Sequence, residues 1–144
     1  MYTVLIADDE AIVRMMLSSM IDWDEMELKL AGCVSNGREA LAYLEQHPVD
    51  ILITDIQMPV IDGLELISRV KSDKFTRHIP LIVVSARISE SDQAEGLDLG
   101  ADAYLTKPFS SVVLRSVVNR LMTSKKELKD YYYSPESAYE QSGG

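Results

Sequence analysis

The sequence predicts an α/β fold built on a parallel sheet, and three observations support this. Short, uninterrupted apolar runs recur along the chain, as in strands that are buried on both faces. Each run is followed by a segment whose apolar residues have helical spacing. The alternation occurs five times within 144 residues, which is the length of one ordinary domain. We therefore expect one domain whose strands are joined by right-handed crossovers.

The apolar runs place five strands, at residues 4–7, 30–34, 49–54, 81–84 and 103–105. The expected helices comprise residues 10–21, residues 36–46, a segment beginning at residue 62, residues 89–99, and residues 110–132. Asn36 followed by Glu39 resembles a capping box, and Pro48 ends that second helix. Gly100 follows the fourth helix at a position typical of a helix C-terminus.

Composition excludes several classes of function. The net charge is −9, from 23 acidic and 14 basic residues, so free nucleic acid is a poor direct partner. No apolar run reaches the ~18–20 residues of a membrane helix, and the acidic N-terminus is unlike a signal peptide. The single cysteine, Cys33, excludes an internal disulfide and fits a reducing cytoplasm. Its apolar strand predicts an inert thiol in the core.

Polar side chains follow four of the five expected strands, and in a parallel sheet these strand ends meet at one edge, where ligands bind. The residues concerned are Asp8, Asp9, Asp55, Ser85 and Lys107. Carboxylates packed together repel one another, and Mg²⁺ relieves this repulsion while keeping positions for phosphate oxygens. An ammonium and a hydroxyl suit the oxygens of a phosphoryl group. The set therefore predicts the transfer of a phosphoryl group to a carboxylate.

Four motifs with these residues stand in order along the chain: ADDE at residues 7–10, DIQMPVIDG at 55–63, VSA at 84–86 and AYLTKPF at 103–109. With them, residues 2–122 resemble the receiver domain of bacterial two-component response regulators. The resemblance implies a flavodoxin-like (βα)5 doubly wound sheet with strand order 2-1-3-4-5. It also implies a cytoplasmic protein whose partner is a sensor histidine kinase.

The resemblance assigns roles around the acceptor. Asp55 takes a phosphoryl group from the phosphohistidine of the kinase. Asp9 binds Mg²⁺ directly, Asp8 binds it through water, Asp55 is a further ligand, and Gln57 contributes its backbone carbonyl. The domain is then no conventional enzyme, but it catalyses its own phosphoryl transfer and its own dephosphorylation.

The resemblance also assigns a switch. Lys107 pairs with the phosphoryl oxygens, and its peptide bond to Pro108 is cis in the family. Ser85 and Tyr104 match the pair that responds to phosphorylation and rebalances the face formed by the fourth helix, fifth strand and fifth helix. The plain alternative for Tyr104, on a short apolar strand, is core packing.

Residues 21–41, 88–109 and 125–134 look like receivers attached to AraC-type DNA-binding domains, so we expect a role in regulating transcription. We divide the chain into a receiver at residues 1–123 and a helical extension with a polar tail at 124–144. Leu114, Leu121 and Leu128 are spaced by seven, so the last helix either pairs with a second copy or leads to an output domain. The simpler interpretation is a slightly long final helix.

Other functions fit less well. A haloacid-dehalogenase-like phosphatase, which also forms an aspartyl phosphate, needs a second aspartate where this chain has Gln57. A flavin-binding module needs a loop rich in small polar residues where Asp8, Asp9 and Glu10 would repel phosphate. A stand-alone receiver that acts through protein–protein contacts remains the main alternative.

Overall fold

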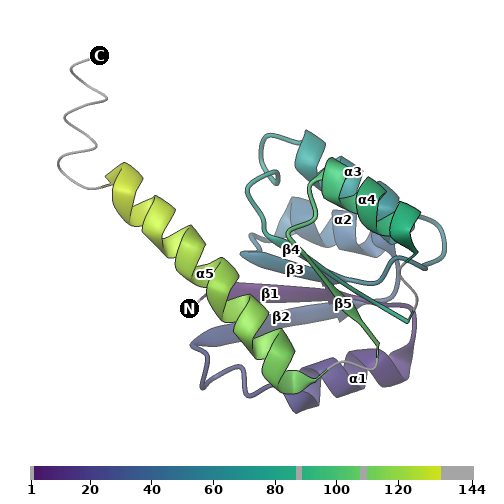
Figure 1. The fold of residues 1–144 in the computed structure, drawn as a ribbon, viewed down its shortest axis with the longest axis horizontal. Coiled ribbons are helices and arrows are strands. Elements are labelled where there is room, and N and C mark those ends of the chain that lie inside the picture. Colours follow the sequence, from purple (N-terminus) through teal and green to yellow (C-terminus); the bar gives the residue numbers. More distant parts are fainter. Residues whose placement is uncertain (1, 87–88, 108–109, 134–144) are drawn as a thin grey trace.

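The structure is a computed structural model and describes residues 2–86, 89–107 and 110–133 (Figure 1), with the backbone alone at residue 20 and residues 125–133. Its strands are β1 (Tyr2–Ala7), β2 (Leu28–Val34), β3 (Ile51–Thr54), β4 (Leu81–Ser85) and β5 (Ala103–Thr106). Its helices are α1 (Ala11–Met20), α2 (Gly37–Gln46), α3 (Gly63–Ser72), α4 (Glu90–Leu99) and α5 (Ser111–Tyr133).

The five strands form one parallel sheet in the order β2-β1-β3-β4-β5. α1 and α5 cover one face of the sheet, and α2, α3 and α4 cover the other (Figure 1). This is the flavodoxin-like arrangement. The predicted fold class and strand order are therefore confirmed.

The central strands are apolar on both faces, which is why they read as continuous apolar runs. In β1, Val4 and Ile6 pack with the core beneath α1 and α5, whereas Leu5 and Ala7 face the core beneath α2 and α3. β3 and β4 alternate in the same way. The sheet is thus held between two apolar cores, one under each layer of helices.

Side-chain caps fix the start of three helices. The side chains of Asn36, Asp62 and Ser89 each accept a hydrogen bond from the backbone N–H three residues further on. At the other end of α4, Gly100 has a φ of 113°, the left-handed conformation expected of it.

The edge strand β2 corrects one prediction about the core. Cys33 is exposed, so it is not the buried core thiol that its apolar neighbours predict. Because β2 pairs with only one strand, its residues are covered less completely than those of β1 or β3.

The last helix is long, as predicted. Leu114, Val118 and Met122 are buried against the sheet, and the helix continues to Tyr133 after this face is covered. Within the described residues, no helix is long and apolar enough to cross a membrane.

Candidate active site

Four strand ends meet at one edge of the sheet and carry the predicted residues. Asp8 directly follows β1, Asp55 directly follows β3, Ser85 ends β4, and Lys107 directly follows β5. Asp8, Asp55 and Ser85 are buried, although all three are polar. Burying such groups is unfavourable unless they are paired, so their partners define the site.

Lys107 is the common partner of the two buried carboxylates. Its Nζ lies 2.9 Å from Asp8 Oδ2 and 3.3 Å from Asp55 Oδ2, and both contacts have hydrogen-bond geometry. Glu10 Oε1 is 3.8 Å from the same nitrogen. One ammonium therefore joins the ends of β1, β3 and β5.

Backbone amides hold the other oxygen of each carboxylate. Asp8 Oδ1 accepts a hydrogen bond of 2.9 Å from the Glu10 N–H, and Asp55 Oδ1 accepts one of 2.7 Å from the Ile56 N–H. With Oδ1 fixed by the backbone and Oδ2 by Lys107, each carboxylate has one defined orientation. Such fixed geometry is what a group-transfer site requires.

The electrostatics of the site are unbalanced toward negative charge. Burial raises the pKa of Asp8, and the Asp55 carboxylate adds to the rise, although the Glu10 amide and Lys107 oppose it. Burial lowers the pKa of Lys107, but its hydrogen bond to Asp8 and the charge of Asp55 outweigh this, so the pKa ends above its ordinary value. Lys107 is therefore held as a cation, and the acids beside it would gain from a further positive charge.

Four carboxylates are arranged so that they could share a metal ion. One oxygen from each of Asp8, Asp9, Glu10 and Asp55 lies within 4.8 Å of the others. Asp9 and Glu10 are exposed, whereas the other two are buried. An all-oxygen set beside open solvent fits a hard cation such as Mg²⁺, which keeps several waters.

The sequence did not single out Glu10 as a member of this group. Its position directly after the aspartate pair was the available signal. The side chain of Gln57 is exposed. The predicted cis bond at Pro108 lies outside the described residues.

The loop after Asp55 is shaped by close backbone packing. The Gly63 N–H donates a hydrogen bond of 2.7 Å to the Ile56 carbonyl, and a β-carbon at Gly63 would collide with the backbone of Asp55 and Ile56. Val60, in the same loop, has a φ of 69°, which is strained for a β-branched residue. The α3 N-terminus therefore supports the acceptor directly.

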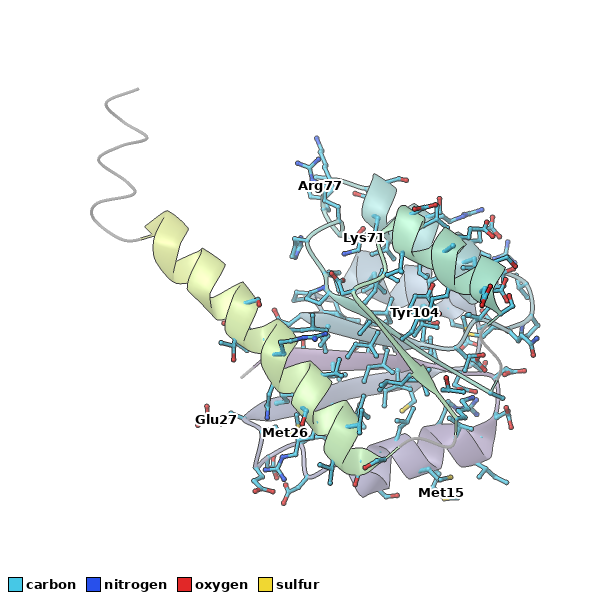
Figure 2. The ribbon with its side chains drawn as sticks, viewed as in Figure 1. Met15, Met26, Glu27, Lys71, Arg77 and Tyr104 are labelled. Carbon is cyan, nitrogen blue, oxygen red and sulfur yellow. The ribbon has the colours of Figure 1, made fainter. Side chains whose placement is uncertain are left out.

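The predicted switch residues lie on neighbouring strands. Ser85 pairs with Thr106 across β4 and β5, and Val83 pairs with Tyr104. The half-buried Tyr104 side chain lies between β5 and α4 (Figure 2), and its hydroxyl donates a hydrogen bond of 3.3 Å to the Asp92 carbonyl. Tyr104 is thus in contact with one of the elements that the switch is expected to move.

The face of α1 beside the acidic site is apolar and exposed. Ile12, Met15 and Met16 are 66%, 62% and 45% exposed, and Figure 2 shows Met15 turned away from the sheet. The sequence pattern marks an apolar helix but cannot tell which of its apolar residues reach the core. Leu17, and Ile21 just after the helix, do so, whereas Ile12, Met15 and Met16 do not.

A cluster of acidic side chains around one lysine, at the carboxyl edge of a 2-1-3-4-5 sheet, defines the class of receiver-like domains. The model of the response regulator receiver domain matches residues 4–119, so this chain belongs to that family. Members of this family are phosphorylated by histidine kinases and bind Mg²⁺ in an acidic active site.

Among curated relatives, the response regulator GtcR of Aneurinibacillus migulanus is 39% identical over 108 residues, which is 75% of this chain and 42% of GtcR. The phosphate regulon transcriptional regulatory protein PhoB of Pseudomonas aeruginosa is 37% identical over 123 residues, 83% of this chain and 49% of PhoB. The chain therefore spans less than half of either relative.

Solved structures show the same fold. The REC domain of AraT, a response regulator from Geobacillus stearothermophilus, has a TM-score of 0.81 at 34% identity and covers 89% of this chain and 98% of its own. The receiver domain of the sensor histidine kinase PA1611 from Pseudomonas aeruginosa, at 22% identity, has a TM-score of 0.74 over 85% of this chain and 98% of its own. That receiver domain has a magnesium ion coordinated in its active site cleft.

Proposed function

We propose that Asp55 is the phosphoryl acceptor of this receiver and that Lys107 and Mg²⁺ assist the transfer. The phosphorylated receiver then regulates transcription through an output partner. The observation that carries this is the placement of Asp55, which is buried at the centre of the site with one oxygen tied to the backbone. Its Oδ2 is the oxygen available for reaction.

Asp55 Oδ2 attacks the phosphorus of a phosphohistidine, the P–N bond breaks, and the imidazole leaves with its electron pair and takes up a proton. The product is an acyl phosphate on Asp55. Hydrolysis by water later restores the carboxylate and releases inorganic phosphate.

Lys107 supplies the fixed positive charge for this step. Its side chain is 13% exposed, and its Nζ lies 3.3 Å from Asp55 Oδ2. The ammonium can therefore pair with the phosphoryl oxygens as they approach Asp55. Preorganised charge of this kind is the main contribution that a protein makes to phosphoryl transfer.

Asp8, Asp9 and Asp55, with the Gln57 backbone carbonyl, are the residues that would hold Mg²⁺, and Glu10 lies in the same carboxylate cluster. When bound, Mg²⁺ supplies charge neutralisation for the transferring group. The raised pKa of Asp8 fits this assignment, because a carboxylate that resists ionisation alone is stabilised by a nearby cation.

The exposed α1 face is suited to a protein phosphodonor. α1 begins directly after Glu10, so Ile12, Met15 and Met16 lie next to the acidic site. Exposed apolar side chains grouped beside a reaction centre are typical of protein contacts. We assign this face to the sensor histidine kinase.

The response is transmitted by Ser85 and Tyr104. The acyl phosphate adds charge and acceptor oxygens, toward which the Ser85 hydroxyl moves, and Tyr104 follows. Two packings of α4, β5 and α5 are thereby rebalanced.

The test uses acetyl phosphate with Mg²⁺ and the intact mass of the protein. We expect the wild type to gain one phosphoryl group and Asp55→Asn to gain none. Asp98→Asn, which makes the same change in charge at an exposed position on α4, should behave as wild type. Uptake by Asp55→Asn at the wild-type rate would show that another residue is the acceptor.

A further inference from the structure

Gly96 lies in the interior of α4, where glycine is unfavourable and its presence calls for a structural explanation. Glycine weakens the interior of a helix relative to alanine, because its backbone loses more freedom on folding. Among the ten residues of α4, all of them described, Gly96 alone is buried. It has no positive φ, so the backbone conformation does not require glycine.

The space beside Gly96 is taken by the end of Tyr104. A β-carbon at residue 96 would lie 2.6 Å from Tyr104 Cζ and closer still to Oη. The third-nearest atom, Tyr104 Cε2, is 3.4 Å away, an ordinary contact. Only the hydroxyl end of Tyr104 is therefore incompatible with a side chain at this position.

The same hydroxyl is bonded to α4. It donates a hydrogen bond to the carbonyl of Asp92, which lies one helical turn before Gly96. Burial, with the nearby charges of Asp92 and Glu95, raises the pKa of the phenol, so Tyr104 remains a neutral donor at physiological pH. Tyr104 thus fills the space that a side chain at residue 96 would occupy, and its hydrogen bond joins β5 to α4.

We propose that Gly96 is a positioning residue for Tyr104. By lacking a side chain, it provides the slot in which the hydroxyl end of Tyr104 docks. The contact between β5 and α4 therefore depends on the orientation of that one side chain. The slot stands on the geometry alone. Its regulatory consequence rests on the proposed function, in which Tyr104 responds to the phosphoryl group.

The connection to the acceptor site is short. Tyr104 pairs with Val83, and Ser85 lies two residues further along β4. A shift of Ser85 toward the acceptor changes the strand pair that carries Tyr104. When Tyr104 leaves the slot, α4 loses both the hydrogen bond and the packing that hold it against β5.

If Tyr104 fills the slot, the effect of Gly96→Ala on stability should reverse its sign when the Tyr104 side chain is removed. In the wild type, Gly96→Ala should lower the urea midpoint of unfolding, because the new methyl group and Tyr104 cannot share the space. In a Tyr104→Ala background, the same substitution should stabilise the fold by roughly fivefold in the folded-to-unfolded ratio, the usual gain of alanine over glycine in a helix. Gln93→Ala, at an exposed position of α4, should have the same sign in both backgrounds.

A spectroscopic measurement tests the position of Tyr104 directly. The aromatic NMR signal of Tyr104, identified by its loss in Tyr104→Phe, should be displaced in Gly96→Ala without any activator. Addition of beryllofluoride and Mg²⁺ should then move it less than in the wild type, although beryllofluoride still binds.

Two outcomes would count against different claims. If Gly96→Ala shifts the midpoint in the same direction and by the same factor in both backgrounds, Gly96 does not act through Tyr104 and the slot is wrong. If beryllofluoride fails to bind the wild type, the proposed function is wrong. The unfolding comparison uses no phosphoryl chemistry. It therefore tests whether Gly96 acts through Tyr104, whether or not beryllofluoride binds.

Discussion

Lys107 Nζ lies 2.9 Å from Asp8 Oδ2, a contact between residues 99 positions apart in the chain. The same ammonium reaches Asp55, so the cation stands between two buried carboxylates at neighbouring strand ends. This relationship fixes the orientation of both carboxylates and sets the charge around the acceptor.

Removal of Lys107 should separate phosphorylation from the response. We expect Lys107→Ala still to accept a phosphoryl group from acetyl phosphate, more slowly than the wild type, because Asp55 and the metal-binding acids remain but the fixed positive charge is lost. Without the ammonium, the phosphoryl oxygens lose the partner that draws the strand ends together. The Tyr104 NMR signal should therefore no longer respond to beryllofluoride, and an unchanged response would rule out this role for Lys107.

Mg²⁺ should stabilise the folded protein by mass action. At ten times its dissociation constant, the gain in unfolding free energy is about 1.4 kcal/mol, provided that the unfolded chain does not bind the ion. The melting temperature should rise with added Mg²⁺ in the wild type and in Asp98→Asn. It should not rise in Asp9→Ala, and a persistent rise there would place the ion elsewhere.

The pH dependence of stability should carry a signature of Asp8. Its pKa is raised above the ordinary value of 3.8 in the folded state, chiefly by burial. The Asp8 contribution to stability is therefore present below pH 3.8 and is lost as the pH rises through the raised pKa.

In the Asp8→Asn variant, the side chain at residue 8 has no proton to lose between about pH 3 and pH 7. Without divalent cations, the unfolding free energy of this variant relative to wild type should therefore increase from about pH 3 to pH 7. Urea unfolding at each pH measures the difference. A constant difference across the range would mean that Asp8 is not perturbed by burial.

Gly63→Ala should damage the acceptor loop. A β-carbon there meets the backbone of Asp55 and Ile56, which cannot move aside as a flexible side chain can. We expect a loss of about 1–3 kcal/mol in unfolding free energy, as for other overpacked sites, together with slower uptake from acetyl phosphate.

Gly32→Ala is the matched control for Gly63→Ala. Its β-carbon would meet Tyr43 Cε2 at 3.6 Å, an ordinary contact, so both stability and phosphoryl uptake should stay near wild type. Equal effects of the two substitutions would show that Gly63 has no special place in the loop.

The extension of α5 beyond its core face predicts self-association or a connection to an output domain. If Leu128 lies in a dimer seam, sedimentation should show a dimer that forms or tightens with beryllofluoride in the wild type and is lost in Leu128→Asp. Ser124→Asp, at an exposed position of α5, is the control. Monomers in every sample would leave the simpler interpretation of a long final helix.

Much of the fold could be predicted from the sequence because its signals are local. Apolar runs in β1, β3 and β4 follow from burial on both faces, and the caps at Asn36, Asp62 and Gly100 act within a few residues. The polar residues at the strand ends could also be grouped, because parallel strands bring their carboxyl ends to one edge.

The exposure of individual apolar residues could not be predicted in this way. Cys33 stands in an apolar run and is exposed, because β2 is at the edge of the sheet. Ile12, Met16 and Leu17 belong to the same apolar segment, but only Leu17 of these three is in the core. The pattern gives the period of a helix and not its contacts.

The sequence by itself determined the order of strands and helices, the acids and the lysine that meet at the sheet edge, and the family. The tertiary structure decided which oxygens face Lys107, that Glu10 joins the acidic group, and that the hydroxyl of Tyr104 occupies the space beside Gly96. The physical reason is distance along the chain. Propensities, caps and apolar periods act over a few residues, whereas these contacts depend on how separate strands and helices pack against one another.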